Sequence, residues 1–302
     1  MMTSTLMPTP SMTPIAPIGS FDQVTDVQLN RYAELIYLRT GIRVSPQKKA
    51  LLSNRLRRRL RSTGIKNFEA YYLHLKKLAA ADPEWDAFIQ EITTHETYLF
   101  RDETQWTWFR GTYLAGLAAS QAQHTGLMKP TLRIWSAACS TGDEPYTAAC
   151  CVAGALDLAK WQVRILATDI GVGALRQAKT GVFGQRAIRL VPPDLRNRFF
   201  TKTPGVEAWH AAPVLGNMLT FRQHNLMEPI HERQFDLVFL KNVLIYFNEQ
   251  SKTVVLQNIR SAMRPGGLLM VGMAEGVADL LRDLERINPW LYRKPIARST
   301  KP

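Results

Sequence analysis

The chain has 302 residues, 46% of them hydrophobic, which is enough to bury one large core or two moderate ones. Its formal net charge of +13 indicates an anionic partner, which could be nucleic acid, a membrane surface or an acidic protein. Three cysteines, two of them adjacent, exclude a disulfide framework, and the lack of a signal peptide or a long apolar run predicts a cytoplasmic protein that does not insert into membranes.

The N-terminal third divides into a tail and a helical region. Residues 1–20 mix Pro, Ser, Thr and Met without periodicity, which predicts a disordered tail. Residues 21–92 repeat apolar side chains at helical spacing and predict an all-α domain. Within it, one helix is expected to begin at Ser45 and Pro46 and to end at Gly64, with a leucine at every fourth position as its buried stripe.

This helix is strongly basic. From Arg39 to Lys66 the chain has ten Lys or Arg residues and no Asp or Glu. Exposed helix faces usually mix both signs, so the excess favours a docking surface for an acidic partner over a role in solubility alone. The docking residues that we predict lie largely outside the leucine stripe: Arg55, Arg57, Arg58 and Arg61.

Residues 93–302 predict a second domain of alternating strands and helices. The aromatic-rich segment 91–110 (EITTHETYLFRDETQWTWFR) is expected at the join between the two domains, a place that often lines a cleft. Further along, apolar runs at 162–168, 235–240 and 267–273 alternate with helical patterns at 143–159, 171–180 and 249–263. This alternation is typical of an α/β fold with a mostly parallel sheet covered on both faces.

The stretch LRIWSAACSTGDEPYTAA (132–149) predicts the first strand of that sheet, a tight loop and a helix. Only Gly142 in the loop is a glycine, so neither a dinucleotide fingerprint nor a phosphate loop is present. Asp143 and Glu144 would repel a phosphate from the helix start. We therefore expect a nucleotide-like ligand that carries an amine or a sulfonium.

Residues 195–225 depart from the alternation, with short pieces separated by turn residues. They predict a small antiparallel insertion at about 195–220 that ends in the strand LTFRQHNL.

Polar side chains follow three successive strands. Asp169 ends the second strand, where a carboxylate can hold ribose hydroxyls or cap the next helix, and both interpretations can hold together. Asn225 follows one later strand, and Lys241 with Asn242 follows the next. Packing alone does not explain three polar strand ends, which therefore predict a ligand site.

Five blocks occur in the order in which one known family has them: TTHETYLFRD (93–102), WSAACSTGDEPYT (135–147), ATDIGVGALRQAKTGVF (167–183), FDLVFLKNVLIYF (235–247) and RPGGLLMVGMAEGV (264–277). From about 21 to 294 the chain resembles the CheR-type methyltransferases, which transfer a methyl group from S-adenosylmethionine to glutamate side chains of membrane chemoreceptors. The resemblance implies a methyltransferase fold with an antiparallel insertion, preceded by a helical domain. The implied partner is the set of acidic methylation helices of a receptor, and the oligomeric state stays open.

The resemblance also implies roles for particular residues. Arg101 corresponds to a cofactor contact and Tyr246 to a tyrosine near the transferred methyl. From their chemistry, we expect Arg101 to position either the cofactor's carboxylate or that of the acceptor, and the Tyr246 hydroxyl to orient the acceptor carboxylate. The other implied cofactor contacts, with the loop glycine included, are His95, Thr97, Gly142, Glu144, Asp169, Asn225, Leu226, Lys241 and Asn242. His95 stands where the family usually has Asn, Lys241 where Arg is usual, and GMAEG where GHSEN is common. Lys241 keeps its charge but cannot form a bidentate fork.

The chemistry of such a transfer requires no general base. A glutamate carboxylate has a reference pKa of about 4.3 and is already ionised at neutral pH. Holding it in line with a sulfonium methyl and removing water from both is what remains for the protein to do. The six histidines have no metal-binding spacing, so we expect no metal site.

Two other functions are considered. A nucleic-acid methyltransferase would share the cofactor fold and the basic charge, but the segment after Asn242 has no prolines and no cysteine follows a proline. The basic helix also lacks interleaved aromatic residues for stacking on bases, and we expect no nucleic-acid partner. A non-catalytic module that only binds the cofactor is the second alternative, and a methyl-transfer assay would separate it from an enzyme.

Overall fold

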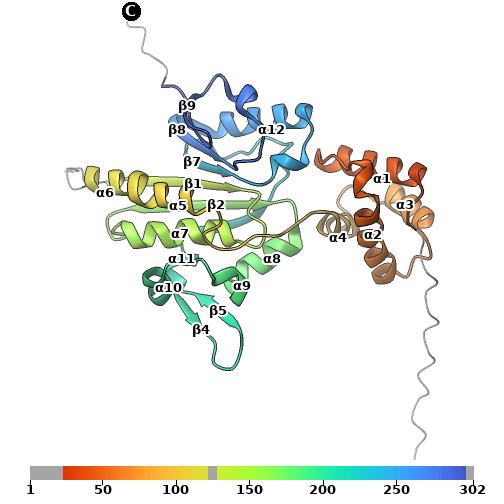
Figure 1. Ribbon diagram of the computed structural model, residues 1–302, viewed down its shortest axis with the longest axis horizontal. Helices are drawn as coiled ribbons and strands as arrows, with labels where there is room; N and C mark the ends of the chain where they lie inside the picture. Colours follow the sequence, from red (N-terminus) through yellow and green to blue (C-terminus); the bar gives the residue numbers. More distant parts are fainter. Residues whose placement is uncertain (1–22, 122–127, 297–302) are drawn as a thin grey trace, which may run out of the picture.

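The computed structural model describes residues 23–121 and 128–296, so the predicted tail at 1–20 lies outside the described residues. Figure 1 shows two lobes, a helical one coloured red to brown and a larger one built around a sheet. Each lobe has its own buried hydrophobic cluster. Within the described ranges, no helix combines the length and the apolar character needed to cross a membrane.

The helical lobe contains four α-helices, α1 (Asp26–Thr40), α2 (Lys49–Thr63), α3 (Phe68–Lys77) and α4 (Pro83–Ile92). Helix α1 begins with a capping box, in which Thr25 and Gln28 satisfy each other's backbone N–H groups. Helix α2 ends at Gly64 as predicted, because this residue adopts the left-handed conformation with φ 73°. Its start differs, since Ser45 and Pro46 begin a separate 3₁₀ turn, Pro46–Lys48, and the Ser45 side chain forms no cap hydrogen bond.

The larger lobe holds a seven-stranded sheet with the order β6-β2-β1-β7-β8-β10-β9. Strands β6, β2, β1, β7 and β8 run parallel to one another. At the other edge, β10 pairs antiparallel with β8, and β9 pairs antiparallel with β10. The strand bounds are β1 Thr131–Ala137, β2 Gln162–Asp169, β6 Leu219–Gln223, β7 Phe235–Leu240, β8 Met263–Val271, β9 Glu285–Asn288 and β10 Leu291–Arg293. The mostly parallel α/β fold that the alternation predicted is confirmed.

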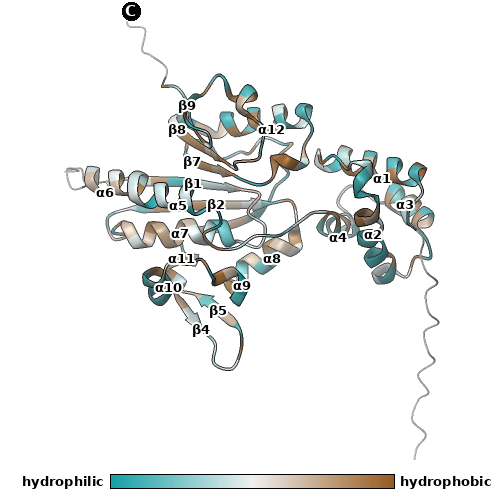
Figure 2. Ribbon diagram, in the orientation of Figure 1, coloured by the Kyte–Doolittle hydropathy of each residue, from teal (hydrophilic) through white to brown (hydrophobic). Residues whose placement is uncertain are grey.

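Helices precede and connect these strands. They are α5 (Glu103–Trp108), which continues through a π-helical turn at Phe109–Leu114 into α6 (Ala115–Gln121) before β1, then α7 (Asp143–Ala155), α8 (Val172–Thr180) and α12 (Glu249–Ala262). Helices α5, α7 and α12 pack into the main core of the lobe, whereas Leu175 of α8 belongs to a smaller cluster with Cys139 and Ala167. Figure 2 shows the brown, hydrophobic strands of the sheet beside helices that alternate brown and teal. Helix α7 is buried over most of its length, and Cys150 and Cys151 pack within it as free thiols.

The predicted insertion is present, but its extent was wrong. It forms a three-stranded antiparallel sheet from β3 (Val182–Gly184), β4 (Phe200–Lys202) and β5 (Ala208–Ala211), with α9 (Gln185–Ile188), α10 (Pro193–Phe199) and α11 (Pro213–Gly216) around it. Figure 1 shows β4 and β5 projecting away from the main sheet. The strand within LTFRQHNL, β6, instead pairs in parallel with β2 as the edge of the main sheet.

The two lobes are joined by hydrogen bonds as well as by the chain. The Arg43 backbone N–H donates to the Tyr246 carbonyl at 2.9 Å, and the Asn225 side-chain amide donates to the Arg39 carbonyl at 2.9 Å. On the other side, the backbone N–H of Ala174 donates to the Gln90 side chain at 3.0 Å. These contacts place helices α1 and α4 against the carboxyl ends of strands β1, β2, β6 and β7.

Candidate functional site

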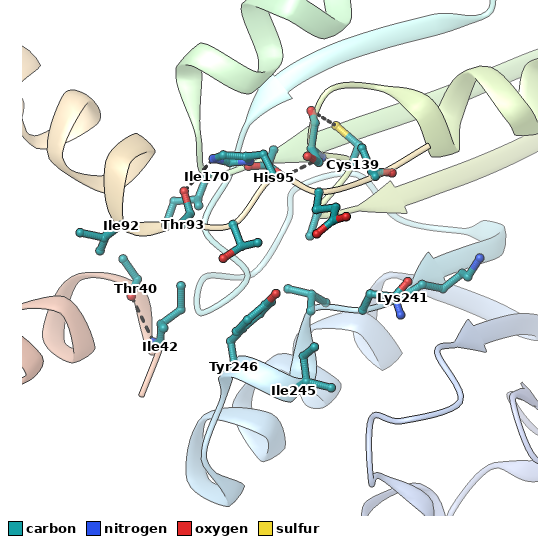
Figure 3. A pocket seen from close by; sticks show the side chains of 18 of the residues that line it. Thr40, Ile42, Ile92, Thr93, His95, Cys139, Ile170, Lys241, Ile245 and Tyr246 are labelled. Carbon is teal, nitrogen blue, oxygen red and sulfur yellow. Dashed lines mark hydrogen bonds between the residues drawn. The ribbon is translucent and has the colours of Figure 1, made fainter. Parts of the chain in front are cut away.

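A cavity of about 540 Å³ lies between the two lobes, at the carboxyl ends of the parallel strands. This is the edge of an open α/β sheet where ligands bind. Figure 3 shows Thr40 and Ile42 from the helical lobe across from Tyr246, which lies in the 3₁₀ turn Leu244–Tyr246 after β7, with His95 and Cys139 above them and Lys241 farther away. The segment 92–98, which we predicted at the join between domains, forms one side of the cavity.

The turn after β1 forms the floor of the cavity. Three of its residues have positive φ angles: Ala138 at 68°, Ser140 at 50° and Gly142 at 93°. A Cβ on Gly142 would lie 2.8 Å from the Cβ of Ala178, so glycine here lets helix α7 approach helix α8. Gly142 therefore shapes the turn but does not line the cavity, unlike the other predicted cofactor residues.

Asp169 ties this turn to the end of β2. One of its carboxylate oxygens accepts from the Ser140 backbone N–H at 2.8 Å and the other from the Gly171 N–H at 2.8 Å. The second bond fixes the turn before α8, but the N-cap of that helix is Gly171 and no side chain caps it, so the expected capping role of Asp169 was wrong. Burial raises the pKa of this carboxyl, while the two amides oppose the shift.

Lys241 is the charged centre of the sheet side, with a side chain only 2% exposed. Its ammonium lies 3.1 Å from the Asp102 carboxylate and 3.9 Å from that of Glu144, and it donates to the Arg101 carbonyl at 3.3 Å. Burial raises the pKa of Glu144, whereas Lys241 and the Ser136 hydroxyl favour its ionised form. Lys241 thus anchors the loop that carries Arg101.

Arg101 and Tyr246 both line the cavity. The Arg101 guanidinium donates to the Glu96 carbonyl at 3.1 Å, and no carboxylate of the described residues forms an ion pair with it. The Tyr246 ring has the Lys48 ammonium 5.3 Å from its centroid. Neither side chain is locked by a strong partner, so both are available to a bound molecule.

The remaining predicted residues contribute in different ways. His95 contacts the Thr93 hydroxyl at 2.7 Å, and burial lowers its pKa below the usual value. The Asn225 amide nitrogen donates to the Arg39 carbonyl across the lobes, and its amide oxygen accepts from the nearby Met227 N–H at 3.1 Å, so both polar atoms already have partners. Thr97, Leu226 and Asn242 also line the cavity, and their side chains form no such hydrogen bonds to other described residues.

The basic residues of α2 divide between the cavity and the surface. Arg55 donates to the Ile92 carbonyl and to the Thr94 hydroxyl and lines the cavity, so its predicted docking role, if it has one, would be at the cavity and not on the open surface of α2. Arg58 forms an ion pair with Glu91 at 2.6 Å, Arg57 is half-buried and Arg61 is exposed. Periodicity placed Arg55 correctly outside the leucine stripe, but only the tertiary structure shows the carbonyl that it reaches.

The sequence interpretation missed Glu275, a buried carboxylate behind the turn that bears Tyr246. Its oxygens accept from the backbone N–H groups of Val243 and Ile245. An available signal was an acid that comes shortly after a buried strand, in the block GMAEG.

The donor set of the cavity suits S-adenosylmethionine. Two carboxylates, Glu144 and Asp169, line the cavity, and Lys241 beside them is already paired with acids. The buried Ser140 hydroxyl has no hydrogen-bond partner among the described residues, which leaves a polar atom for a ligand at the turn. Such a site accommodates a nucleoside with a sulfonium and without phosphates. Among residues 23–121 and 128–296, no group of three His, Cys, Asp or Glu side chains is arranged to hold a metal ion.

Comparisons with known proteins agree with this geometry. The family described as "CheR methyltransferase, SAM binding domain" matches residues 95–289, and "CheR methyltransferase, all-alpha domain" matches residues 28–93. The chain is 34% identical to chemotaxis protein methyltransferase 2 of Pseudomonas aeruginosa, over 95% of this chain and 99% of that protein. It is 30% identical to the chemotaxis protein methyltransferase of Salmonella typhimurium (89% and 90% covered) and 31% identical to that of Escherichia coli (86% and 87% covered).

Proposed function

Because the chain belongs to the CheR methyltransferase family, we propose that it methylates glutamate side-chain carboxylates on chemoreceptors. Membership in the family makes it an S-adenosylmethionine-dependent methyltransferase of chemotaxis, and the proposal concerns the acceptor and the residues that serve it. The observation that carries the proposal is the convergence of Arg101, Tyr246 and the strand-end carboxylates in one cavity that opens beside the basic helix α2.

We assign cofactor binding to the sheet side of the cavity. Asp169 is placed to accept from ribose hydroxyls, and Glu144 provides a negative charge that favours a cationic group nearby. Thr97, Asn242, Leu226 and His95 complete this side of the proposed site. When bound, S-adenosylmethionine supplies a methyl group on a positively charged sulfur. The protein's part is to exclude water and to hold the acceptor in line.

We assign the acceptor to the side where Arg101 and Tyr246 face the cavity. A tight ion pair with the attacking carboxylate would reduce its nucleophilicity, so we give Arg101 an orienting role. The Tyr246 hydroxyl donates a hydrogen bond that orients the same carboxylate. No base is required, since the acceptor arrives ionised, and the protein contributes position and desolvation.

The charge around the cavity supports an acidic acceptor. Its lining includes Arg43 and Lys48 beside α2, and Arg186 and Arg189 in and after α9, on the insertion side. Arg186 is paired with Glu96, whereas no carboxylate among the described residues pairs with the other three. An acidic receptor helix that approaches the cavity would meet cations from both lobes, which favours association and specificity more than raw affinity.

A nucleic-acid acceptor is not favoured, because the segment Asn242–Tyr246 lacks the prolines expected for base methylation and the basic face of α2 has no stacking aromatics. We propose a cytoplasmic location, which is the one that the sequence predicts.

A methyl-transfer assay tests the proposal. The purified protein is incubated with S-adenosylmethionine labelled in its methyl group and with receptor cytoplasmic fragments, duplex DNA or RNA. We expect label on the receptor fragment that is released as methanol by mild base, since a glutamate methyl ester is base-labile. Label that resists base, or label on nucleic acid, would contradict the proposal. Fragments with the acceptor glutamates replaced by alanine serve as the matched control.

A further inference from the structure

Glu275 holds the backbone that carries Tyr246. It lies in the loop after β8 and is 1% exposed. One carboxylate oxygen accepts from the Val243 N–H at 3.2 Å and the other accepts from the Ile245 N–H at 3.0 Å. Both amides lie just before Tyr246 in the chain, so a single side chain fixes the turn from both of its oxygens.

This carboxylate has no cation as its partner. Among the described residues no Lys or Arg forms an ion pair with Glu275, and the Lys252 ammonium donates to its backbone carbonyl at 2.6 Å instead. Burial raises the pKa of Glu275, while the backbone N–H groups from Asn242 to Ile245 favour its ionised form. A buried, unpaired carboxylate is costly unless hydrogen bonds satisfy it, so the carboxylate and the turn stabilise one another.

Gly272 provides the space for this arrangement. A Cβ at position 272 would lie 2.7 Å from the Glu275 Oε1 atom and 3.1 Å from the Asn242 backbone nitrogen. Any other residue would push the carboxylate away from the turn. The turn itself needs such support, because Asn242 adopts a positive φ of 57°, which is unfavourable for a non-glycine residue.

We propose that Glu275 is a positioning residue for methyl transfer, which acts by fixing the 242–246 turn and thereby the Tyr246 hydroxyl. It does not line the cavity, so it acts through the turn and touches neither cofactor nor acceptor. The inference rests on the proposed function, because it needs Tyr246 to orient the acceptor.

Two variants disturb the turn by independent means. Glu275→Gln replaces one accepting oxygen with an amide that faces a backbone donor, and Gly272→Ala displaces an intact carboxylate. For both we expect kcat to fall by about tenfold or more, since small misplacement of a reacting group costs that much. The dissociation constant of S-adenosylhomocysteine, measured by calorimetry, should change by a smaller factor than kcat, because Asn242 is the one proposed cofactor residue in the turn, whereas Asp169 and the β1 turn are untouched.

Asp236→Asn is the matched control. The Asp236 carboxylate also accepts from a backbone N–H, that of Arg133 at 2.7 Å, and, unlike Glu275, it pairs with Arg264 as well. It lies near the start of β7 and away from the cavity. This variant should lose comparable thermal stability and keep its kcat. A fall in kcat for Glu275→Gln that is no larger than that of the control would overturn the inference.

A double-mutant cycle with Tyr246→Phe separates positioning from a general structural effect. If Glu275 acts through the tyrosine hydroxyl, Glu275→Gln should reduce kcat by less than about twofold further in the Tyr246→Phe background. Full additivity of the two effects would overturn the inference and leave the proposed function intact. An unchanged kcat for Tyr246→Phe alone would contradict the proposed role of Tyr246, and the inference with it.

Discussion

The two sides of the cavity are built in different ways. On the sheet side, buried groups hold the backbone: Asp169 accepts from two amides, Glu275 accepts from two more, and Lys241 lies between two acids. The helical lobe instead carries long, partly exposed cations on α2, as in the pair between Arg58 and Glu91, whose side chains are 49% and 28% exposed and do not line the cavity.

The difference matches the two molecules that the sides serve in the proposed function. A small cofactor has a fixed shape and benefits from a rigid, desolvated surface, because preorganised groups pay no cost of ordering when it binds. A receptor helix arrives from solution and is attracted by charges that stay hydrated and mobile. The sheet side should therefore control chemistry and cofactor affinity, and the helical side should control encounter with the acceptor.

The largest effect is expected from removing the buried charge. Lys241→Ala leaves Asp102 and Glu144 without their cation, and removal of one member of a buried ion pair costs about 3–5 kcal/mol. The free energy of unfolding, measured in urea, should fall by that order. Arg58→Ala, which breaks an exposed pair on the helical side, should lower it by less than about 1 kcal/mol. Equal losses would show that the two sides do not differ as described.

The next effect concerns turnover. Tyr246→Phe and Arg101→Ala should each lower kcat by about 10- to 100-fold, since each removes a group that orients the acceptor in a desolvated site. Their melting temperatures should stay within a few degrees of the wild type. Melting losses with preserved kcat would show that these side chains serve packing alone.

Cofactor affinity should respond to Asp169. In Asp169→Asn, the amide NH₂ group faces one of the two backbone N–H donors, which then loses its acceptor. The substitution also removes the negative charge that we expect to bind the ribose hydroxyls. Hydrogen bonds to charged groups contribute about 1.5–3 kcal/mol. Calorimetry with S-adenosylhomocysteine should show binding that is weaker by about tenfold or more. Affinity equal to that of the wild type would remove Asp169 from the site.

A smaller effect is expected on the helical side. Arg61→Ala should raise the KM for the receptor fragment by a few-fold without changing kcat, and the difference should shrink as salt screens it. Arg282→Ala, which removes the same charge from an exposed position that does not line the cavity, is the control and should leave the KM unchanged. If both variants changed the KM equally, net charge and not α2 would govern the encounter.

The smallest effect is an expected absence of pH dependence. Burial lowers the pKa of His95 below its ordinary value of 6.5. The imidazole is therefore neutral above pH 6.5 and takes up a proton only at a lower pH. The acceptor carboxylate is ionised throughout, so kcat/KM should be flat from pH 8 to 6.5. The His95→Asn variant should show the same flat profile. A wild-type limb in this range that disappears in His95→Asn would reveal a histidine that acts as a base.

Local patterns predicted what depends on neighbouring residues. The strand, turn and helix around Gly142 follow from apolar runs and small residues, and the meeting of Asp169 with Asn242 follows from the shared edge of parallel strands. The family resemblance then supplied the assignments that composition could not, such as Arg101 and Tyr246.

What the sequence left open depends on contacts between distant positions. The residues of strand β6 are half-buried or exposed, so its sequence has no continuous apolar run. A pattern of this kind does not reveal whether the strand joins the main sheet or the insertion. The pair between Lys241 and Asp102 spans 139 positions, and Glu275 reaches back about 30 positions to its amides. Periodicity within one element carries no information about such pairs.

The central claim is that the strand ends of the sheet hold the cofactor and present its methyl group to an ionised acceptor beside Tyr246. A crystal structure of the protein with S-adenosylhomocysteine tests this most directly. We expect the adenosine between the Ser140 turn and Asp169, with the sulfur facing Tyr246. The molecule bound among the α2 arginines, or anywhere outside the cavity between the lobes, would contradict the account.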